Sequence, residues 1–217
     1  MSDQLTQDLE YDVIFGVFPP GARIIEDRVM EIYGAKRHAV RNAFAELEAR
    51  GLLVRRPNRG VEVVDFTPDE VDALYDVRII LETAAAERTD LPCDPQIAAR
   101  LNDIAKRHET AVNEQDLRAV FWLNQEFHEV QYSCCGNPRL AELISKHARA
   151  AQPIRVIKYE DRVHMKQIVS QHYDIIAAMR GTSQDALVAA VRAHLPASAE
   201  AYRTLYNRRF GARAQPA

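Results

Sequence analysis

The sequence predicts a mainly α-helical protein, in which an N-terminal winged helix-turn-helix precedes an all-helical bundle of about six helices. Helical periodicity is broken early by Pro19-Pro20-Gly21 and then gives way to short strand-like runs. The chain after residue 66 reads as helical almost throughout. Basic residues gather between Lys36 and Arg59, although the formal net charge is −3. We therefore expect a DNA-binding domain at 1–66, a helical domain at 67–211 and a tail at 212–217.

The first domain reads as three helices followed by a β-hairpin. Apolar residues recur on one face over residues 4–17, and the proline pair ends that helix. A short helix is expected at about 26–32. The next helix follows the turn at Tyr33-Gly34-Ala35, and its apolar positions have helical spacing at Val40, Ala43, Phe44 and Leu47. Residues 52–56 and 61–64 are strand-like runs around a glycine-containing turn, which predicts a hairpin.

The helix that follows this turn is the candidate DNA-reading helix, because the second helix of such a pair enters the major groove with its N-terminal residues. Arg37 and Arg41 are four residues apart and share a face, and arginine binds both guanine edges and phosphates. A basic stretch alone is usually solvated surface, but the ordered set of helices and basic-tipped hairpin favours DNA binding. The predicted DNA-contacting residues are Lys36, Arg37, His38, Arg41, Arg59 and Gly60.

Composition argues against secreted and membrane classes. The hydrophobic fraction of 47% is ordinary for a globular chain, and no apolar run is long enough to span a bilayer. The first residues lack a signal pattern, so we expect a cytoplasmic protein with no membrane partner. The three cysteines, Cys93, Cys134 and Cys135, are odd in number and lack zinc-site spacing, which indicates reduced thiols.

The second domain is expected to open with Thr67 as the cap and Pro68 as the first helical residue. Turn signals then divide it into helices. These signals lie at Leu91-Pro92, Glu114-Gln115, Gly136-Asn137-Pro138, Tyr159-Glu160-Asp161 and Gly181-Thr182-Ser183. Pro196 also lies inside an apparently helical run, where we expect it to kink the chain and to displace the nearby His194.

Three of the seven histidines lie on apolar stripes of three different predicted helices. His128 follows Asn124 by one turn, and His172 and His194 lie in the last two long helical segments. One such histidine is more often a core residue, but three on three helices fit a divalent metal site inside a bundle. The remaining histidines are expected at the surface, with the first facing DNA; they are His38, His108, His147 and His164.

Arg78 lies in an otherwise apolar stripe, where an unpartnered charge is costly. One interpretation is an intrahelical ion pair with Glu82, four residues later. The other is a guanidinium that binds the carboxylate of a ligand inside the bundle. The sequence leaves both open.

Residues 18–66 resemble the DNA-binding domain of the GntR family, in its FadR-like branch. The resemblance rests on Pro20-Gly21, Arg37, Val40-Arg41, Leu47-Glu48, Gly51-Leu52-Leu53 and Arg59-Gly60-Val61-Glu62-Val63. It implies that Arg37, Arg41 and the wing at Arg59-Gly60 contact operator DNA. Around the reading helix the chain departs from the usual family pattern, with Ala35-Lys36-Arg37-His38-Ala39.

Residues 68–210 resemble the FCD effector domain of the same branch. The resemblance rests on Arg78-Ile79-Ile80-Leu81-Glu82, Asn124-Gln125-Glu126-Phe127-His128, His172 and His194-Leu195. It implies a divalent metal, zinc first and nickel or manganese as alternatives, with open positions for water or a small organic acid. The implied ligands are Asn124, His128, His172 and His194. Because three imidazoles and an amide leave the ionic charge uncompensated, we expect a carboxylate that bridges the metal and Arg78.

Together these patterns predict a transcriptional regulator rather than an enzyme: a homodimer on operator DNA that responds to a small carboxylate effector. Two alternatives stay open. A metalloregulator would respond to the ion itself, and a metal-dependent hydrolase would use the histidine site to activate water. No glutamate or aspartate stands out as a general base beside the predicted ligands, which disfavours the hydrolase.

Overall fold

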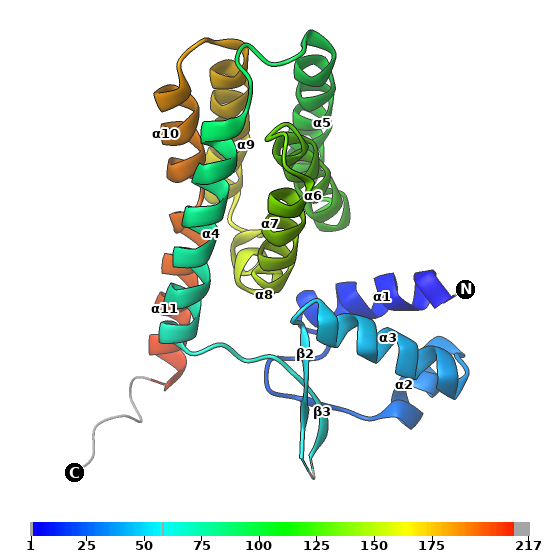
Figure 1. Cartoon of the computed structure of the whole chain (residues 1–217). Helices are drawn as coiled ribbons and strands as arrows, with labels where there is room; N and C mark the ends of the chain where they lie inside the picture. Colours follow the sequence, from blue (N-terminus) through cyan, green and yellow to red (C-terminus); the bar gives the residue numbers. More distant parts are fainter. Residues whose placement is uncertain (1, 58, 211–217) are drawn as a thin grey trace, which may run out of the picture. The chain divides into compact units, whose positions relative to one another are not determined.

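The computed structural model describes residues 2–57 and 59–210, so the predicted tail at 212–217 lies outside the described residues (Figure 1). The chain forms two compact units. The first comprises the chain up to Thr67 together with Arg149–Val156, and the second comprises Pro68–Ala148 and the chain from Ile157 onward. The predicted domain boundary near residue 66 stays a prediction. No local sequence pattern indicates that Arg149–Val156 belongs to the first unit.

The first unit contains the predicted helices and hairpin and one further strand. Strand order in its antiparallel sheet is β1-β3-β2, with Arg23 opposite Glu62 and Leu53 opposite Val63. The elements are α1 (Ser2–Ile14), β1 (Arg23–Ile24), α2 (Glu26–Tyr33), α3 (Arg37–Ala49), β2 (Leu53–Arg56) and β3 (Gly60–Val63). The two-residue strand β1 was not predicted, because a run this short has no periodicity to read.

The turn between α2 and α3 depends on Gly34. Its φ of 60° is left-handed, and its backbone N–H donates to the carbonyl of Met30, which closes α2. Beyond the turn, α3 buries the four apolar positions that the spacing predicted, Val40, Ala43, Phe44 and Leu47. The buried stripe directs the opposite face of α3 outward.

The second unit is a helical bundle. Its helices are α4 (Pro68–Arg88), α5 (Pro95–Glu114), α6 (Leu117–Ser133), α7 (Pro138–Ala150), α9 (Arg162–Arg180), α10 (Gln184–His194) and α11 (Pro196–Phe210). The mainly α-helical fold class is confirmed, as are the helix start at Pro68 and all five predicted breaks. Among the described residues there are seven such helices rather than about six, because the chain also breaks before Pro196, which becomes the first residue of α11.

Side-chain caps start several of these helices where the sequence places short polar residues. The side chains of Asp94, Asp116, Asp161 and Ser183 accept hydrogen bonds from backbone N–H groups in the first turns of α5, α6, α9 and α10. Each cap satisfies N–H groups that a helix leaves unpaired at its start. The breaks between these helices therefore depend on capping residues close in the sequence, which explains why the sequence predicted them.

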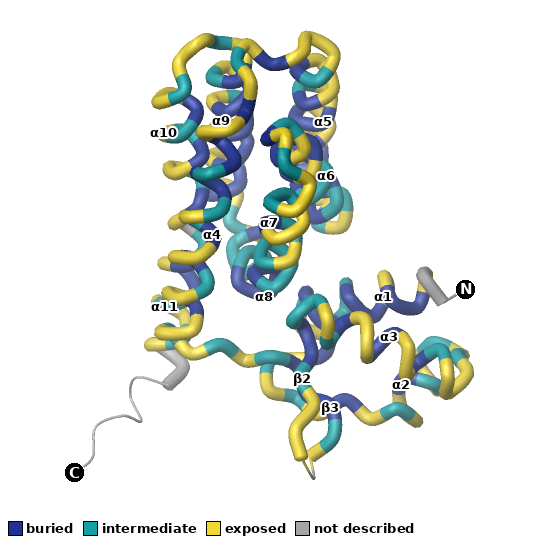
Figure 2. The backbone as a smooth tube through the Cα atoms, viewed as in Figure 1, coloured by how far each residue is buried: buried dark blue, intermediate teal, exposed yellow. Residues whose placement is uncertain are grey.

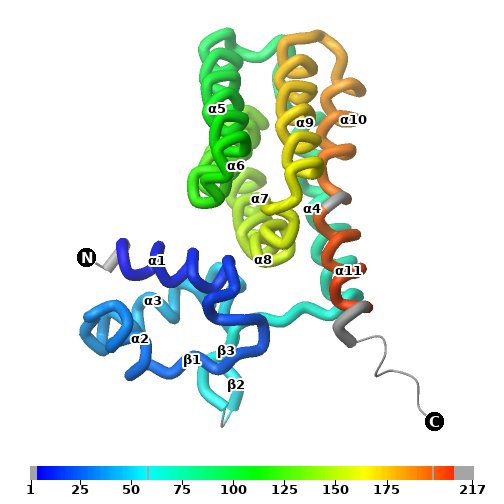
Figure 3. Tube along the Cα trace, turned by 180° about the vertical axis from the view of Figure 1, so that it is seen from behind, coloured from blue at the N-terminus to red at the C-terminus, as the bar shows by residue number. Residues whose placement is uncertain are grey.

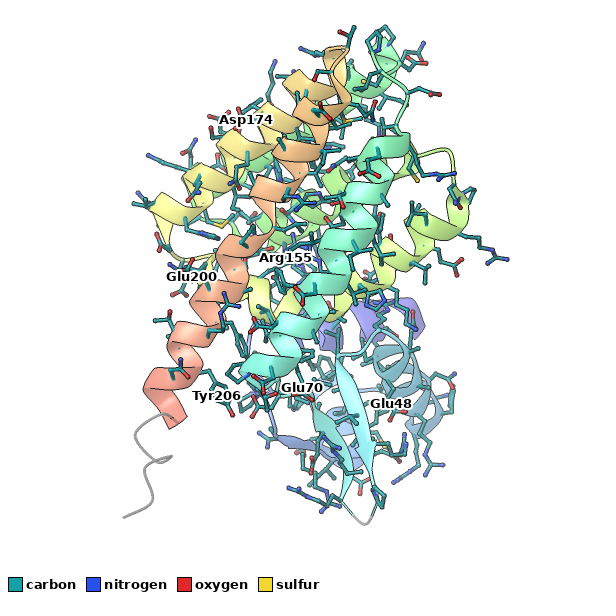
Figure 4. The ribbon with its side chains drawn as sticks, turned by 60° about the vertical axis from the view of Figure 1, so that its left-hand side comes forward. Glu48, Glu70, Arg155, Asp174, Glu200 and Tyr206 are labelled. Carbon is teal, nitrogen blue, oxygen red and sulfur yellow. The ribbon has the colours of Figure 1, made fainter. Side chains whose placement is uncertain are left out.

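The buried stripes of the bundle helices face one another (Figure 2). Helix α5 packs against α6 and α9, and α4 packs against α10 and α11 (Figure 3). Exposed acidic residues such as Asp174 on α9 and Glu200 on α11 lie on the outside of the bundle (Figure 4). This packing brings residues of α6, α9 and α10 together in the interior.

Between α7 and α9 the chain forms α8 (Gln152–Arg155) and the short 3-10 helix η1 (Val156–Lys158). Helix α8 contacts α1 within the first unit. A Cβ atom added to Gly51 would lie 3.3 Å from the Cβ of Ala150, so this segment packs closely on the end of α3. The first unit therefore includes a piece of chain that comes from the middle of the sequence.

No helix in the described part of the chain is long and apolar enough to cross a membrane. All three cysteines are free thiols: Cys93 and Cys135 are buried, and Cys134 is partly exposed. Burial raises the pKa of the Cys93 and Cys134 thiols, which keeps them protonated and weakly nucleophilic.

Candidate DNA interface and metal centre

The start of α3 presents the predicted DNA-reading residues to solvent. Lys36 precedes the helix in an extended conformation, and Arg37, His38 and Arg41 follow on its outer face. All four are exposed, whereas Val40 between them is fully buried. The local arrangement suits a helix that places its first turn against base edges and phosphates.

The two arginines of this surface are held by carboxylates of α2. Arg37 pairs with Glu26 at 3.2 Å and with Asp27 at 2.6 Å, and the Nε of Arg41 lies 3.0 Å from the Oε1 of Glu26. The arginine side chains stay 51% and 63% exposed. Any phosphate or base that binds these guanidiniums competes with Glu26 and Asp27, a feature that the sequence spacing did not predict.

The wing places Arg59 at its tip, where the side chain is 71% exposed and its Nε lies 2.9 Å from the Oε1 of Glu62. Gly60 has a φ of +80°, which disfavours any residue with a side chain. A Cβ added there would lie 3.5 Å from the Nε of Arg23. Strand β1 thus brings Arg23 beside the wing. This exposed basic residue was not among the predicted DNA contacts, because β1 was not predicted.

Arg50 has a structural role instead. Although it lies in the basic stretch, its guanidinium pairs with Glu10 on α1 and with Glu46 on α3. Glu10 is buried, which raises the pKa of its carboxyl group, and the charges of Arg50 and Arg149 oppose that rise. Arg50 therefore joins α1 to α3 inside the unit.

The bundle interior brings together the three predicted metal-binding histidines. The candidate ligand nitrogens of His128 on α6, His172 on α9 and His194 on α10 all lie within 4.8 Å of one another. His128 and His172 are buried, and His194 is partly buried. The break at Pro196 does not remove His194 from the group, because α10 continues through His194 before the chain turns into α11.

Hydrogen bonds fix how two of these imidazoles face each other. The Nδ1 of His128 lies 3.0 Å from the Oε1 of Gln131, and the Nδ1 of His194 lies 3.1 Å from the Oε1 of Gln171. The amide nitrogen of Gln171 donates to the Ala193 carbonyl, which directs its oxygen to His194. An amide oxygen accepts, so these contacts favour the neutral tautomer in which Nδ1 carries the hydrogen and Nε2 has the lone pair.

The two Nε2 atoms of His128 and His194 are 3.1 Å apart. In the tautomer in which both Nε2 atoms have lone pairs, the two atoms repel at this distance, and a cation bound by both removes the repulsion. Nitrogens that bind one zinc ion at about 2.0–2.1 Å are separated by about 2.9 Å at a right angle and by about 3.4 Å at the tetrahedral angle. The donor set therefore fits a divalent metal that prefers imidazole ligands.

The third histidine is held by packing, because the ring of His172 stacks on Phe127 with centroids 4.1 Å apart. Asn124 is buried one helical turn before His128 on α6. Its place as a fourth ligand stays a prediction. The corresponding prediction for Arg78 as an effector-binding residue also stays untested.

Arg78 forms the intrahelical pair that was one of its two interpretations. Its Nε lies 3.0 Å from the Oε1 of Glu82, and the two side chains are 7% and 2% exposed. Burial opposes the charge of Arg78, but Glu82 outweighs burial and the pKa of Arg78 lies above its ordinary value. The Tyr132 hydroxyl donates to the other oxygen of Glu82, and the Tyr132 ring stacks on His128, so this pair is linked to the histidines.

Two of the histidines expected at the surface are buried, and that prediction was wrong for them. His108 on α5 is 0% exposed and His164 on α9 is 7% exposed, whereas His147 is partly exposed and His38 is exposed. His108 continues the buried face of α5 after Leu101 and Ile104, at helical spacing. This periodicity was the signal that could have identified it.

Known protein families match both halves of the chain. Residues 1–63 match the model of the bacterial regulatory proteins of the gntR family, and residues 73–197 match the FCD domain. The structure of McbR/YncC of E. coli superposes with a TM-score of 0.76 at 20% identity, covering 95% of this chain and 98% of that chain. A GntR regulator from Rhodococcus sp. RHA1 gives the same score at 21% identity, covering 94% and 98%. These structural likenesses show the fold.

Two curated relatives extend over most of the sequence. The chain is 27% identical over 192 residues to the uncharacterized HTH-type transcriptional regulator YdhC of Bacillus subtilis (strain 168), covering 88% of this chain and 86% of the relative. It is 23% identical over 205 residues to the HTH-type transcriptional repressor RspR of Escherichia coli (strain K12), covering 94% and 90%. Both relatives are named as regulators rather than enzymes. The chain therefore belongs to the GntR family of bacterial regulatory proteins and is a DNA-binding transcriptional regulator with an FCD domain.

Proposed function

We propose that this regulator binds operator DNA as a homodimer and that a small carboxylate, bound beside a divalent metal in the bundle, modulates its DNA binding. The observation that carries the proposal is the group of three histidines, in which the Nε2 atoms of His128 and His194 lie 3.1 Å apart and His172 is close to both. Zinc is the first candidate, because neutral imidazole is among its preferred ligands. Operator binding in turn implies a cytoplasmic location.

The charge of the site favours an anionic ligand. The three histidines and Asn124 are neutral donors, and the hydrogen-bond partners of His128 and His194 are glutamine amides. A bound divalent ion supplies uncompensated positive charge, which attracts a carboxylate or other small anion to the open positions. The protein residues supply the orientation of the donors and a buried environment that strengthens the attraction.

Arg78 is the second anchor of the proposed ligand, and Glu82 is its competitor. Arg78 already holds one carboxylate, so a ligand carboxylate has to share the guanidinium with Glu82 or displace it. Tyr132 contacts both Glu82 and His128. Ligand binding at the histidines and rearrangement of the Arg78–Glu82 pair are therefore coupled through Tyr132.

The chain connections offer a route from the bundle to the DNA-binding unit. The chain passes between the two units at Thr67–Pro68, and it also enters and leaves the first unit at the ends of Arg149–Val156. A change in the last turn of α7 or in η1 thus reaches the packing of α8 on α1 through covalent bonds. Regulation requires that the effector bind the DNA-competent and DNA-free arrangements with different affinity.

The test combines metal analysis with ligand titration. The purified protein should contain close to one zinc per chain, and His128→Ala should lose it, whereas His147→Ala on α7 should keep it. A screen of small carboxylic acids by thermal shift at fixed zinc should find acids that raise Tm in the wild type and not in His128→Ala. The same acids should change the affinity for genomic operator fragments in a gel-shift titration.

Three results would change the proposal. Release of DNA by the metal alone, with no acid effect, favours a metalloregulator. A protein that holds no metal, and whose Asn124→Ala variant binds acids like the wild type, removes the metal site from the function. A single protomer bound per operator, measured by sedimentation, contradicts the homodimer.

A further inference from the structure

The hydrogen-bond partners behind the histidines form a pattern that includes a fourth histidine. His128 and His194 are each held from behind by a glutamine oxygen, Gln131 and Gln171 respectively. Such outer partners select the tautomer of a ligand imidazole and aim its other nitrogen at the metal. His172 also requires a hydrogen-bond acceptor, because an imidazole that binds a metal through one nitrogen presents an N–H at the other.

The candidate acceptor for His172 is His108, whose ring lies beside it. Helix α5, which carries His108, packs against α9, which carries His172. The two ring centroids are 5.0 Å apart and the planes are tilted by 46°, so the rings are neighbours without being stacked face to face. Phe127 covers a face of the His172 ring at 4.1 Å and offers no hydrogen-bond acceptor there.

Burial of the polar His108 side chain at this position costs free energy. The residue is 0% exposed on a face of α5 otherwise formed by Leu101, Ile104 and small apolar residues. An imidazole buried among aliphatic side chains costs free energy unless its polar atoms are used. An apolar residue of the same volume would fill the space equally well, so packing alone does not explain a histidine here.

We propose that His108 is a positioning residue for the metal centre: it accepts a hydrogen bond from His172 and so directs the other nitrogen of His172 toward the metal. The inference rests on the proposed metal site. With Gln131 and Gln171, His108 completes a set of three outer partners, one for each histidine ligand. None of the three is a carboxylate, so the outer partners leave the charge of the ion available to an anionic ligand.

Cobalt(II) is the probe for this proposal, because its visible absorption reports the ligand geometry directly. The full-length protein, freed of metal with a chelator, is titrated with cobalt chloride, and zinc affinity is then measured by displacement of the cobalt signal. The variants are His108→Leu and His108→Met, which are apolar, and His108→Gln, whose amide oxygen accepts a hydrogen bond. His164→Leu is the matched control, because it replaces another buried histidine on the same helix as His172.

We expect His108→Leu and His108→Met to bind zinc about 10- to 100-fold more weakly than the wild type and to shift the cobalt spectrum. His108→Gln should retain most of the affinity and a spectrum close to that of the wild type, and His164→Leu should match the wild type. Two apolar variants are used so that the test can still be made if one of them fails to fold. Circular dichroism of the metal-free proteins detects such a failure.

Failure of the proposed metal site and failure of the proposed role of His108 give different results. If the wild type and His164→Leu bind no cobalt or zinc, the proposed metal site itself is wrong and the role of His108 falls with it. If they bind metal and the apolar His108 variants bind it with equal affinity and an unchanged spectrum, His108 is only a packing residue. Equal losses in His108→Gln and His108→Leu would also overturn the hydrogen-bonding role.

Discussion

The buried Arg78–Glu82 pair lends itself to a direct test through Glu82→Gln. The substitution keeps the shape of the side chain and removes its charge. In the wild type the carboxylate contacts Arg78 at 3.0 Å and accepts from the Tyr132 hydroxyl. After the substitution, the guanidinium keeps its charge in an interior where its side chain is 7% exposed. The ring of Tyr75, 4.8 Å from the Cζ of Arg78, is already present in the wild type and adds no compensation.

The expected cost follows from burial. Removal of one member of a buried ion pair costs about 3–5 kcal/mol, because the other charge is left uncompensated. The glutamine amide oxygen still accepts a hydrogen bond from Arg78, so we place the loss near the lower limit, at about 3 kcal/mol. A domain of this size loses about 2–4 °C in Tm per kcal/mol, which predicts a decrease of about 6–12 °C.

The assay is thermal unfolding followed by circular dichroism, with Asp72→Asn as the matched control. Asp72 lies on the same helix, α4, and pairs with Arg203, but the side chains are 51% and 38% exposed. An exposed pair contributes about 0.2–1 kcal/mol, so the control should change Tm by only a few degrees. The two variants differ in burial and share the chemistry of a neutralised carboxylate.

The reasoning is refuted if Glu82→Gln loses no more stability than Asp72→Asn. A further check is the double variant Arg78→Met with Glu82→Leu, which removes both charges. Because no charge is then stranded, it should recover at least half of the loss seen in Glu82→Gln. A double variant less stable than Glu82→Gln would show that Arg78 contributes through contacts other than its charge.

Three other perturbations test separate parts of the chain. Glu26→Gln should tighten binding to duplex DNA by about two- to fivefold at low salt, in fluorescence anisotropy, because Arg41 then no longer has to leave the Glu26 carboxylate; weaker binding would show that Glu26 orients the arginine instead. Gly60→Ala should cost about 1–2 kcal/mol of stability in denaturant unfolding, because its φ of +80° is left-handed; an unchanged midpoint would contradict this strain. Burial, followed by Lys158, lowers the pKa of His164, so the unfolded chain takes up the proton first and stability should fall as pH drops below about 6.5. His164→Leu should flatten this loss between about pH 7.5 and about pH 5.5, and an equally steep loss in the variant would assign the acid sensitivity to other groups.

In the DNA-binding unit, local sequence patterns predicted the elements and their buried faces but not the ion pairs between helices. The turn at Gly34, the buried face of α3 and the hairpin before Gly60 all follow from residues close together in the sequence. The ion pairs of Arg37 and Arg41 with Glu26 join residues more than ten positions apart, on two different helices. They depend on how α2 and α3 cross, which periodicity does not specify.

The histidine cluster was predictable in its residues and not in its surroundings. His128, His172 and His194 each lie on a buried stripe, so their direction into the bundle was readable from spacing. His108 has the same signal on α5 and was assigned to the surface, because it lacks a polar neighbour one turn away. Its nearness to His172 arises only when α5 packs on α9.

The sequence by itself determined the mainly α-helical fold, the breaks between helices and the face that each helix buries, because these depend on caps, turns and spacing within a few residues. Tertiary packing alone decided which buried polar groups meet. Side chains separated by tens of residues, such as Glu82 with Tyr132 and His128 with His194, face each other through helix crossings that local rules leave free. The same reason explains Arg149–Val156, a segment from the middle of the chain that packs with the DNA-binding unit through contacts no local pattern encodes.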